Sequence, residues 1–319
     1  MNDLEAIGRA FRDHDRFLIA CHENPEGDAI GSELALALAL RRMGKTATVL
    51  NADPVPSNLL FLPGADTILF EDDGTDYPVS VIVDCGSPER TGRVGDVLAR
   101  SPLQINIDHH KTNGSHGHLR LIDPAAAATG LLIHRLLKSM NEPIGLDVAL
   151  NIYVSVLTDT GSFHYSSANP EAFRTAGDMV ALGIDPWKVS EQLFESQEPN
   201  RVRLLGRVLD SLALSPSGKF ASITTTLRDL ADFSASRDFL EGFINYPRSI
   251  AGVEVAVSFR EEPDGSWRVS FRSKGRVDVA EVAARFGGGG HRNASGCSVV
   301  GSLPQVRERV FGALESALT

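Results

Sequence analysis

The stretch FLIACHENPEGDAIGSELALALAL, residues 17–40, decides the fold of this chain. It opens with the apolar run Phe17–Cys21, which predicts a β-strand, and it continues into the helical pattern Glu33–Met43, which ends before Gly44. The loop between the two is polar and carries histidine and carboxylate side chains. An apolar strand that leads through a polar loop into a helix is typical of α/β proteins.

The same alternation continues through the first half of the chain. Val81, Ile82 and Val83 form a run that is apolar on both faces, as in a buried strand of a parallel sheet. Further strands are predicted at Ala47–Leu50, Thr67–Phe70, Val79–Cys85 and Gln104–Ile107, and helices at Ala125–Met140, Leu146–Leu157 and Pro170–Leu182. We therefore predict the α/β class, with a mostly parallel sheet and helices on both faces. In such sheets ligands bind at the carboxyl ends of the strands.

The second half has a different pattern. A polar helical stretch is followed by three strands and two helices, predicted at Glu198–Leu214, Phe220–Thr226, Val253–Arg260, Trp267–Arg272, Val279–Phe286 and Val306–Leu318. The last two strands flank Glu-Glu-Pro-Asp-Gly, a turn sequence that joins a hairpin. We predict a first domain at residues 1–186, a linker at 187–199, and a smaller α+β domain at 200–319.

Composition excludes several classes of protein. The chain has 319 residues, with 31 Lys+Arg against 41 Asp+Glu and a net charge of −10. The 42% of hydrophobic residues is too much for a disordered chain. The longest apolar stretches, such as Leu34–Leu40, are far shorter than the ~20 residues of a membrane-spanning helix. The acidic excess lies in residues 1–199, whereas residues 200–319 are mildly basic, and this balance disfavours binding to duplex DNA.

The cysteines and the N-terminus indicate a cellular compartment. Cys21, Cys85 and Cys297 lie in apolar segments, and they form neither a disulfide framework nor a CxxC pair. The N-terminal segment is charged and amphipathic, without the apolar run of a secretory signal. We therefore expect a cytoplasmic protein that does not bind a membrane.

Acidic residues and histidines follow several of the predicted elements. Neutral imidazoles and carboxylates together suit a divalent ion such as Mn²⁺, while the absence of thiolate ligands disfavours a structural zinc site. The six candidate ligands are His22, Glu26, Asp28, Asp84, His109 and Asp159. Six ligands fit two ions roughly 3.5–4 Å apart, joined by a bridging carboxylate, better than they fit one ion with open positions.

Each of these residues also has a simpler explanation. Asp28 could cap the helix that follows it, and Asp108 could be a turn residue at a strand end. His109 and His110 could be surface histidines. Because all of them fall at four separate strand or helix ends, the simpler explanations require several coincidences, and we favour the metal centre.

A second cluster lies near the C-terminus. Gly287–Gly290 is a run of four glycines followed by His291, and Arg272, Ser273 and Lys274 precede it in the chain. Backbone N–H groups of glycines can approach phosphate oxygens closely, and arginine and lysine add positive charge. A flexible loop is the common explanation of a glycine run alone, but the adjacent basic residues and histidine favour the phosphate site.

Five motifs, in this order, resemble those of the DHH phosphoesterases. They are HENPEGDAIGS at 22–32, VDCGSPERTG at 83–92, DHH at 108–110, TDTGSF at 158–163 and GGGGHRNASG at 287–296. The chain is similar in particular to the small stand-alone members that degrade nano-RNA and dephosphorylate pAp. The resemblance spans nearly the whole chain, and it implies a DHH domain followed by a DHH-associated domain.

The resemblance also implies roles for individual residues. It implies that one metal ion is held by His22, Glu26 and Asp84, and a second by Asp28, Asp84, His109 and Asp159. Asp84 would bridge the two ions, His110 would face the scissile phosphate, and Asp108 would complete the catalytic group. The nucleotide would be bound by Arg90, Arg272, Ser273, Lys274, Gly288, Gly289, Gly290 and His291.

The chain departs from the family pattern at one position. The first motif of the family normally reads His-x-x-Pro-Asp-Gly-Asp, whereas Glu26 stands here in place of the first aspartate. The glutamate arm is one methylene longer, so the spacing or affinity of the first metal site can differ. Coordination remains chemically feasible because the oxygen donor and its charge are retained.

The function implied is hydrolysis of very short oligonucleotides to mononucleotides, with pAp as a further substrate and two divalent ions, preferably Mn²⁺, as cofactors. Short single-stranded oligonucleotides and small phosphorylated nucleotides would be the partners, and a homodimer is compatible with the sequence. An alternative is a phosphodiesterase for a cyclic dinucleotide such as c-di-AMP, or for its linear product pApA. Another is a non-catalytic nucleotide-binding protein in which Glu26 marks a decayed centre. Family II pyrophosphatases share the first-domain motifs, but the GGGH and Arg-Ser-Lys segments are unlike their second domain.

Overall fold

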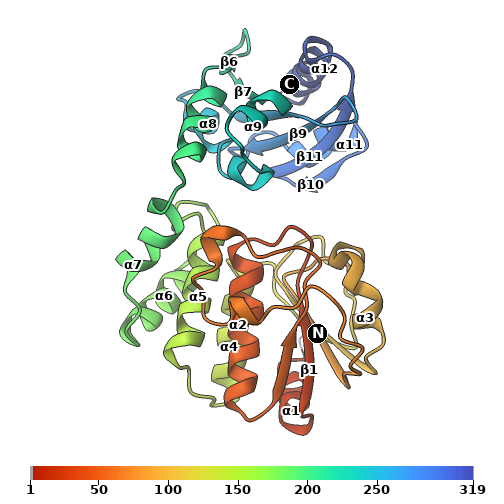
Figure 1. The fold of residues 1–319 in the computed structure, drawn as a ribbon, viewed down its shortest axis with the longest axis vertical. Helices are drawn as coiled ribbons and strands as arrows, with labels where there is room; N and C mark the ends of the chain where they lie inside the picture. Colours follow the sequence, from red (N-terminus) through yellow and green to blue (C-terminus); the bar gives the residue numbers. More distant parts are fainter. Residues whose placement is uncertain (1–2, 319) are drawn as a thin grey trace. The chain divides into compact units, whose positions relative to one another are not determined.

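A computed structural model describes residues 3–318 of the chain as two compact units, which divide between Ser196 and Gln197 (Figure 1). This division lies inside the segment predicted as a linker, but that segment is helical. It contains α7 (Pro186–Ser190) and a π-helical turn at Glu191–Glu195. Asp185 explains where α7 begins, because its side chain accepts a hydrogen bond from the backbone N–H of Trp187.

The first unit contains a five-stranded sheet in which every neighbouring pair is parallel. The strand order is β2-β1-β3-β4-β5. The strands are β1 (Arg16–Ala20), β2 (Thr46–Val49), β3 (Val79–Val83), β4 (Leu103–Asp108) and β5 (Leu119–Ile122). All five residues of β3 are buried, as its apolar run predicts. The predicted parallel sheet is confirmed.

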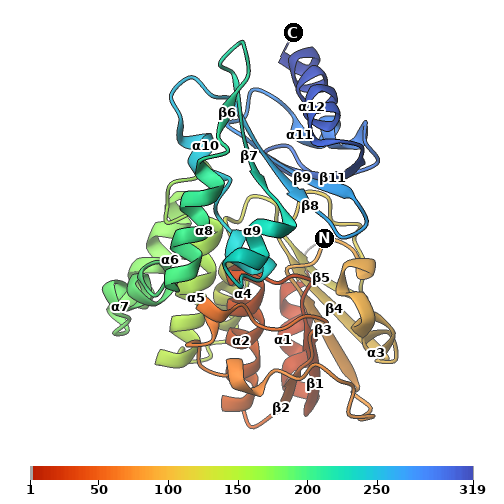
Figure 2. The same cartoon turned by 45° about the horizontal axis from the view of Figure 1, so that its top comes forward.

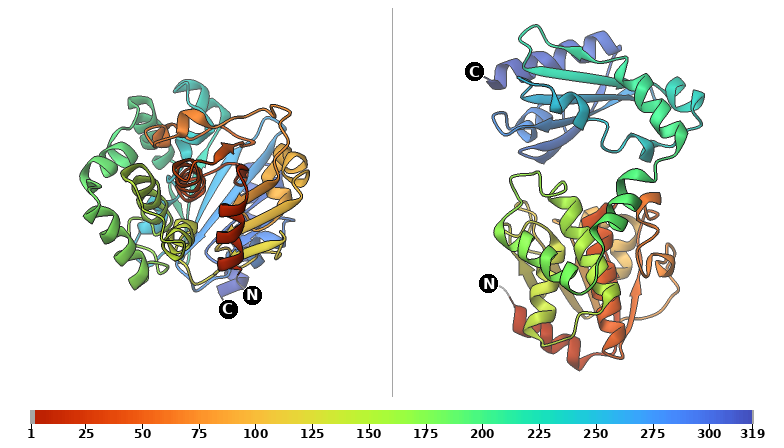
Figure 3. Two further views of the ribbon diagram at one scale, coloured as in Figure 1. Left: turned by 90° about the horizontal axis from the view of Figure 1, so that it is seen from below. Right: turned by 90° about the vertical axis from the view of Figure 1, so that its left-hand side faces the viewer.

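Helices cover both faces of this sheet, because the strands are apolar on both sides (Figure 3). Phe17 and Ile19 of β1 point into the larger core, whereas Leu18 and Ala20 point into a smaller core with α3 on the opposite face. The helices of this unit before α7 are α1 (Leu4–Asp13), α2 (Gly27–Arg42), α3 (Gly95–Ala99), α4 (Thr129–Ser139), α5 (Leu146–Asp159) and α6 (Pro170–Ala181).

The strands of the first unit differ from the prediction in two places. The strand expected at Thr67–Phe70 is wrong. The chain instead forms a 3₁₀ turn at Ala65–Thr67 and a single bridge between Leu50 and Leu69. Gly64, in the left-handed region at φ +90°, turns the chain just before this segment. Strand β5 was not predicted, because it has only four residues at the edge of the sheet.

The second unit contains a six-stranded mixed sheet, in the order β10-β11-β9-β8-β7-β6. Only β7 and β8 are parallel to each other. The strands are β6 (Ala213–Leu214), β7 (Phe220–Thr225), β8 (Val255–Glu261), β9 (Ser266–Ser273), β10 (Gly289–His291) and β11 (Ala294–Val300). The sheet with its helices confirms the predicted α+β character of this half.

Five α-helices in the described part of this unit accompany the sheet, and Figure 2 labels them. They are α8 (Pro199–Leu209), α9 (Leu227–Asp232), α10 (Asn245–Ser249), α11 (Val279–Ala284) and α12 (Leu303–Leu318). Helices α11 and α12 share a hydrophobic core with one face of the sheet, and α8 packs near β7 in a smaller cluster with Ile223. Among residues 3–318, none of the helices combines the length and apolar character needed to cross a bilayer.

Gly289 and Gly290 of the glycine run, together with His291, form β10 and pair with β11, so this part of the run is not a flexible loop. A Cβ on Gly288 would lie 2.2 Å from the carbonyl oxygen of Gly296, and one on Gly290 would lie 2.6 Å from that of Ala294. Gly290 also has a φ of +140°, which side-chain-bearing residues rarely adopt. Close strand pairing therefore explains two of the four glycines without reference to a ligand.

Candidate metal centre

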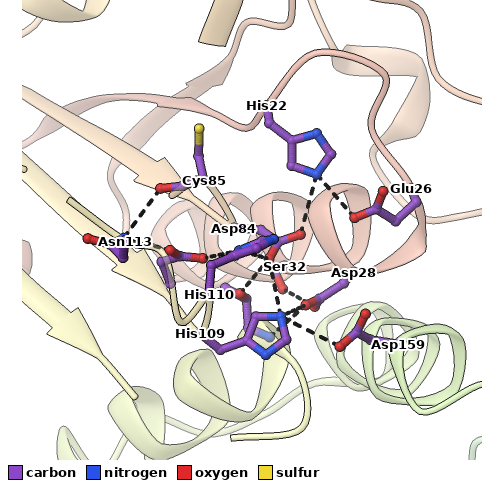
Figure 4. Close-up of polar contacts among 12 residues, drawn as sticks. His22, Glu26, Asp28, Ser32, Asp84, Cys85, His109, His110, Asn113 and Asp159 are labelled. Atoms are coloured by element: carbon purple, nitrogen blue, oxygen red, sulfur yellow. Dashed lines mark hydrogen bonds and ion pairs between the residues drawn. The ribbon is translucent and has the colours of Figure 1, made fainter. Parts of the chain in front are cut away.

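The candidate ligands converge at the carboxyl ends of the strands in the first unit (Figure 4). His22 follows β1, Asp84 follows β3, and His109 follows β4. Asp28 lies in the first turn of α2, and Asp159 is the last residue of α5. Because the three strands are parallel neighbours, their carboxyl ends meet at one edge, as the sequence predicts.

The ligand atoms form three overlapping groups, each with its atoms within 4.8 Å of one another. The groups are His22, Glu26 and Asp84; Asp28, His109 and Asp159; and Asp84, His109 and His110. All six predicted metal ligands belong to them. Asp84 connects the groups through different oxygens: its Oδ2 lies 3.7 Å from His22 Nε2, and its Oδ1 lies 3.6 Å from His109 Nε2.

The backbone at Asp84 is unusual. Its φ is +53°, in the left-handed region that residues other than glycine seldom adopt, although aspartate tolerates it better than most. The side chain is 1% exposed. A buried carboxylate on a strained turn at a strand end is an arrangement found mainly at functional sites.

Backbone contacts fix the tautomers of the two histidines. The Nδ1 of His22 lies 2.7 Å from the carbonyl oxygen of Glu23, and the Nδ1 of His109 lies 3.0 Å from that of Ala126. A carbonyl only accepts, so each Nδ1 carries the proton and donates it. In the neutral ring, Nε2 therefore presents a lone pair to the carboxylates, which is how metal-binding histidines are commonly held.

These lone pairs face oxygen atoms that are themselves acceptors. His22 Nε2 lies 3.1 Å from Glu26 Oε1, and His109 Nε2 lies 3.4 Å from Asp28 Oδ2 and 3.5 Å from Asp159 Oδ2. Acceptors at these distances repel one another unless a positive charge lies between them. The arrangement therefore calls for cations, either protons on the rings or metal ions.

The electrostatics of the site lead to the same requirement. Burial lowers the pKa of His22, but Asp84 and Glu26 outweigh it and raise the pKa to about 11. Burial raises the pKa of Asp159 to about 7 despite the opposing effect of His109. Burial, with the charge of Asp84, also raises the pKa of Asp28 well above its usual range. The crowded carboxylates thus favour bound cations, and the raised pKa values show the site retaining protons in that role.

Three hydroxyl groups that the sequence analysis did not identify orient the carboxylates. The hydroxyl of Thr129, at the start of α4, donates to Asp84 Oδ1 at 2.9 Å. Asp28 Oδ1 accepts from Ser32 at 3.0 Å and from Ser155 at 2.5 Å. The backbone N–H of Thr129 donates to Asp28 Oδ2 at 2.7 Å. Serine and threonine in apolar helices give no sequence signal for such a role.

Ser155 links α4, α5 and the metal centre. It is fully buried, and its Oγ accepts from the N–H of Gly130 at 3.0 Å while donating to Asp28. A Cβ on Gly130 would lie 2.1 Å from this Oγ, so the glycine leaves the space that the hydroxyl occupies. The contacts of Ser155 and Ser32 with Oδ1 leave Oδ2 directed toward His109.

We expect Ser155→Ala to weaken divalent-metal binding by roughly 10- to 100-fold, because Asp28 loses the shorter of its two hydroxyl donors and with it part of its fixed orientation. Calorimetric titration with Mn²⁺ measures the effect directly. The matched control is Ser80→Ala, a buried serine whose Oγ donates to the carbonyl of Leu98 at 3.0 Å, away from the ligands. Equal metal affinity in the two variants would refute the role of Ser155.

Asp108 contacts the His110 ring through a hydrogen bond to its Nδ1. Its Oδ1 accepts from His110 Nδ1 at 2.6 Å, and its Oδ2 accepts from Asn113 Nδ2 at 2.6 Å. Asp108 is fully buried, and it is absent from the three groups of candidate ligands. This geometry makes it a residue that orients the His110 ring, and Asn113 is a further partner that sequence analysis missed.

The predicted nucleotide-binding residues lie in two places. Arg90 is exposed and belongs to the 3₁₀ segment η3 (Pro88–Val94) of the first unit. The others lie in the second unit, where Arg272 pairs with Ala294 and Ala294 pairs with His291. Cross-strand partners project from the same face, so Arg272 and His291 share one side of the sheet.

The neighbours of Arg272 are less available for binding. Ser273 is buried, and its Oγ accepts from the N–H of Gly275 at 2.9 Å. Lys274 donates through Nζ to the carbonyl of Ile250 at 3.1 Å. The roles of these residues and of the glycine run in nucleotide binding stay predictions.

Comparison with known families agrees with the two-unit organisation. Residues 16–157 match the family described as "DHH family, N-terminal domain", and residues 221–318 match the family described as "DHHA1 domain". The sequence is 34% identical to a Thermus thermophilus protein named bifunctional oligoribonuclease and PAP phosphatase NrnA, over 94% of this chain and 90% of that one.

Two solved structures are also similar. An exopolyphosphatase-related protein from Bacteroides fragilis is 30% identical, with a TM-score of 0.93 over 98% of this chain and 95% of that chain. RecJ from Thermus thermophilus, solved in complex with Mn²⁺, has a TM-score of 0.56 at 16% identity, over 98% of this chain and 54% of that chain. The second similarity is one of fold.

Proposed function

This chain belongs to the DHH family of phosphoesterases, and from that premise we propose that it is a metal-dependent hydrolase of very short oligonucleotides, releasing mononucleotides, and of the 3′-phosphate of pAp. The observation that carries the proposal is the set of three overlapping histidine–carboxylate groups, two of which contain Asp84. The Thermus thermophilus relative, named for both activities, supports the choice of substrates.

The donor set fits divalent ions. Each histidine presents Nε2 to carboxylate oxygens, a mixture that suits Mn²⁺ or a similar ion. The nearby thiol of Cys85 donates to the carbonyl oxygen of Ser87 at 3.0 Å, and among the described residues Cys85 belongs to none of the candidate ligand groups. We assign His22, Glu26 and Asp84 to one ion, and Asp28, Asp84, His109 and Asp159 to the other. When bound, the ions supply charge that stabilises the phosphoryl transition state and lower the pKa of water.

The protein's own residues position the substrate at this centre. Asp108 accepts the Nδ1 proton of His110 and fixes its ring, so the opposite nitrogen is oriented to contact a phosphate oxygen. Asn113 in turn holds Asp108. Arg272 and His291 in the second unit are assigned to the phosphate or nucleotide of the substrate. Few such contacts are expected, and long strands then gain little additional affinity.

A product time course with Mn²⁺ tests the proposal. We expect mononucleotides from pApA and from a five-nucleotide RNA, AMP from pAp, and no product from duplex DNA. Chelation by EDTA should abolish every reaction. Hydrolysis of c-di-AMP with no reaction on the RNA would instead favour the cyclic-dinucleotide alternative. Failure to hydrolyse any of these substrates would contradict catalysis by this site.

Substitutions in the second unit should weaken substrate binding without changing the metal content of the protein. Arg272→Ala and His291→Ala are expected to weaken substrate binding by about 1.5–3 kcal/mol each, the contribution of a hydrogen bond to a charged group. Their metal content should equal that of the wild type, because neither residue lies in the metal-binding groups. Michaelis constants for pAp and metal analysis of the purified variants test both statements. Loss of metal from either variant would contradict the assignment of these residues to substrate.

A further inference from the structure

One face of the sheet in the second unit carries arginines and hydroxyl groups. The side chains of β9 alternate: Trp267, Val269 and Phe271 enter the core that contains α11 and α12. Arg268, Ser270 and Arg272 therefore project from the opposite face. Arg268 is exposed, and the other two are half-buried. Arg268, Ser270 and Arg272 thus form a polar row along β9.

The strands beside β9 contribute mainly small residues to this face. Ser270 lies opposite Ser258 of β8 and Gly296 of β11, and Arg268 lies opposite Ser298. The guanidinium of Arg268 extends across Gly296, since its Nη2 lies 3.5 Å from the point that a Cβ on that glycine would occupy. Small neighbours leave the guanidinium and the nearby hydroxyls accessible from solvent.

Arg268 is an uncompensated positive charge. Its direct cross-strand neighbour is Arg260, whose Nη2 forms an ion pair with Glu262 at 2.7 Å. That pairing reduces the repulsion expected between two arginines placed opposite each other. Within residues 3–318, Arg268 itself forms no ion pair. An exposed arginine beside serine hydroxyls, without an acidic partner, matches the chemistry of a phosphate group.

We propose that Arg268, with Ser270 and Ser298, forms a second phosphate subsite that binds an internucleotide phosphate of a single-stranded oligonucleotide. This subsite rests on the proposed function, which assigns another part of the substrate to Arg272. Arg268 and Arg272 are four residues apart on one strand, which separates them by about 13 Å. A mononucleotide such as pAp is too short to reach both, whereas an oligonucleotide can extend along the strand.

The subsite would therefore determine the preferred length of the substrate. Its contacts are to phosphate, so it should show no base preference and should weaken as the salt concentration rises. No aromatic side chain of β9 lies on this face, because Trp267 and Phe271 are in the core. Base stacking on β9 therefore does not contribute, and charge carries the interaction.

The test is the length dependence of hydrolysis in Arg268→Gln. We expect the ratio of kcat/KM for a five-nucleotide RNA to that for pApA to fall by about tenfold. Arg268→Lys should restore part of the ratio, since it returns the charge without the fork-shaped guanidinium. The control is Arg309→Gln, an exposed arginine of α12 on the side of the sheet that the helices cover, which should keep the wild-type ratio.

A binding measurement supports the kinetic one. Fluorescence anisotropy of a labelled five-nucleotide RNA, without added metal, measures how the binding constant depends on salt concentration. In Arg268→Gln this dependence should be weaker by the contribution of about one phosphate contact. An unchanged length ratio together with an unchanged salt dependence would overturn the subsite. Failure of the proposed function gives a different result, because the wild-type protein would then hydrolyse neither RNA.

Discussion

Replacement of Asp84 by asparagine is expected to lower kcat/KM on the order of 10³-fold, because both ligand groups lose the carboxylate they share. Its two oxygens face different histidines, with Oδ2 3.7 Å from His22 Nε2 and Oδ1 3.6 Å from His109 Nε2. Asparagine has nearly the same volume and also tolerates the φ of +53° at this position. The fold should therefore survive the change, and the effect should be chemical.

Three measurements on purified Asp84→Asn separate chemistry from folding: bound metal, turnover of pApA and the thermal unfolding temperature. We expect bound metal and turnover to fall together while the unfolding temperature stays near that of the apo wild type. The control is Asp72→Asn, which removes a surface ion pair with Arg100 at 2.7 Å. Near-normal turnover in Asp84→Asn would contradict a centre built around a shared carboxylate.

The position of this centre was predictable because parallel strands impose it. Once Phe17–Cys21, Val79–Cys85 and Gln104–Ile107 are interpreted as parallel strands, the polar residues after them must meet at one edge. The structure places His22, Asp84 and His109 there. Strand direction is a strong constraint, and it determined the location of the site without any information on side-chain geometry.

The orienting residues were not predictable for a related reason. Ser155 and Thr129 lie in apolar helical patterns, where a hydroxyl commonly bonds to its own helix backbone. Their role depends on how closely α2, α4 and α5 pack, and Gly130 leaves the space for Ser155. Contacts that depend on helix packing leave no pattern in the sequence of a single helix.

The same limit applied to the glycine run. Its sequence is compatible with a flexible loop or a phosphate cradle, and the structure shows a short strand, β10, that pairs with β11. Strand β11 was missed because Gly296 and the small residues around it have weak strand propensity. Pairing with β9, whose buried face is aromatic and aliphatic, stabilises β11 despite that propensity.

The position of the Glu26 side chain favours a role as a metal ligand over a role in capping the helix. Its backbone caps α2, but its side chain makes no capping hydrogen bond. Instead Oε1 lies 3.1 Å from His22 Nε2, although the side chain is 46% exposed and could extend into solvent. If Glu26 acted only on the helix dipole, its contribution would be about 0.3–1 kcal/mol of stability. The longer arm thus reaches the same histidine that the shorter family residue would serve.

Glu26→Ala is accordingly expected to lose one of the two proposed ions, with the affinity for that ion reduced on the order of 100-fold, because His22 and Asp84 alone are a poor site. Glu26→Asp should retain two ions and activity, with an altered Mn²⁺ dependence, since the carboxylate is kept on a shorter arm. Glu23→Ala is the control, because its side chain packs against Gly92 rather than His22. A titration that finds two ions bound to Glu26→Ala with wild-type affinity would show that Glu26 acts only at the helix terminus.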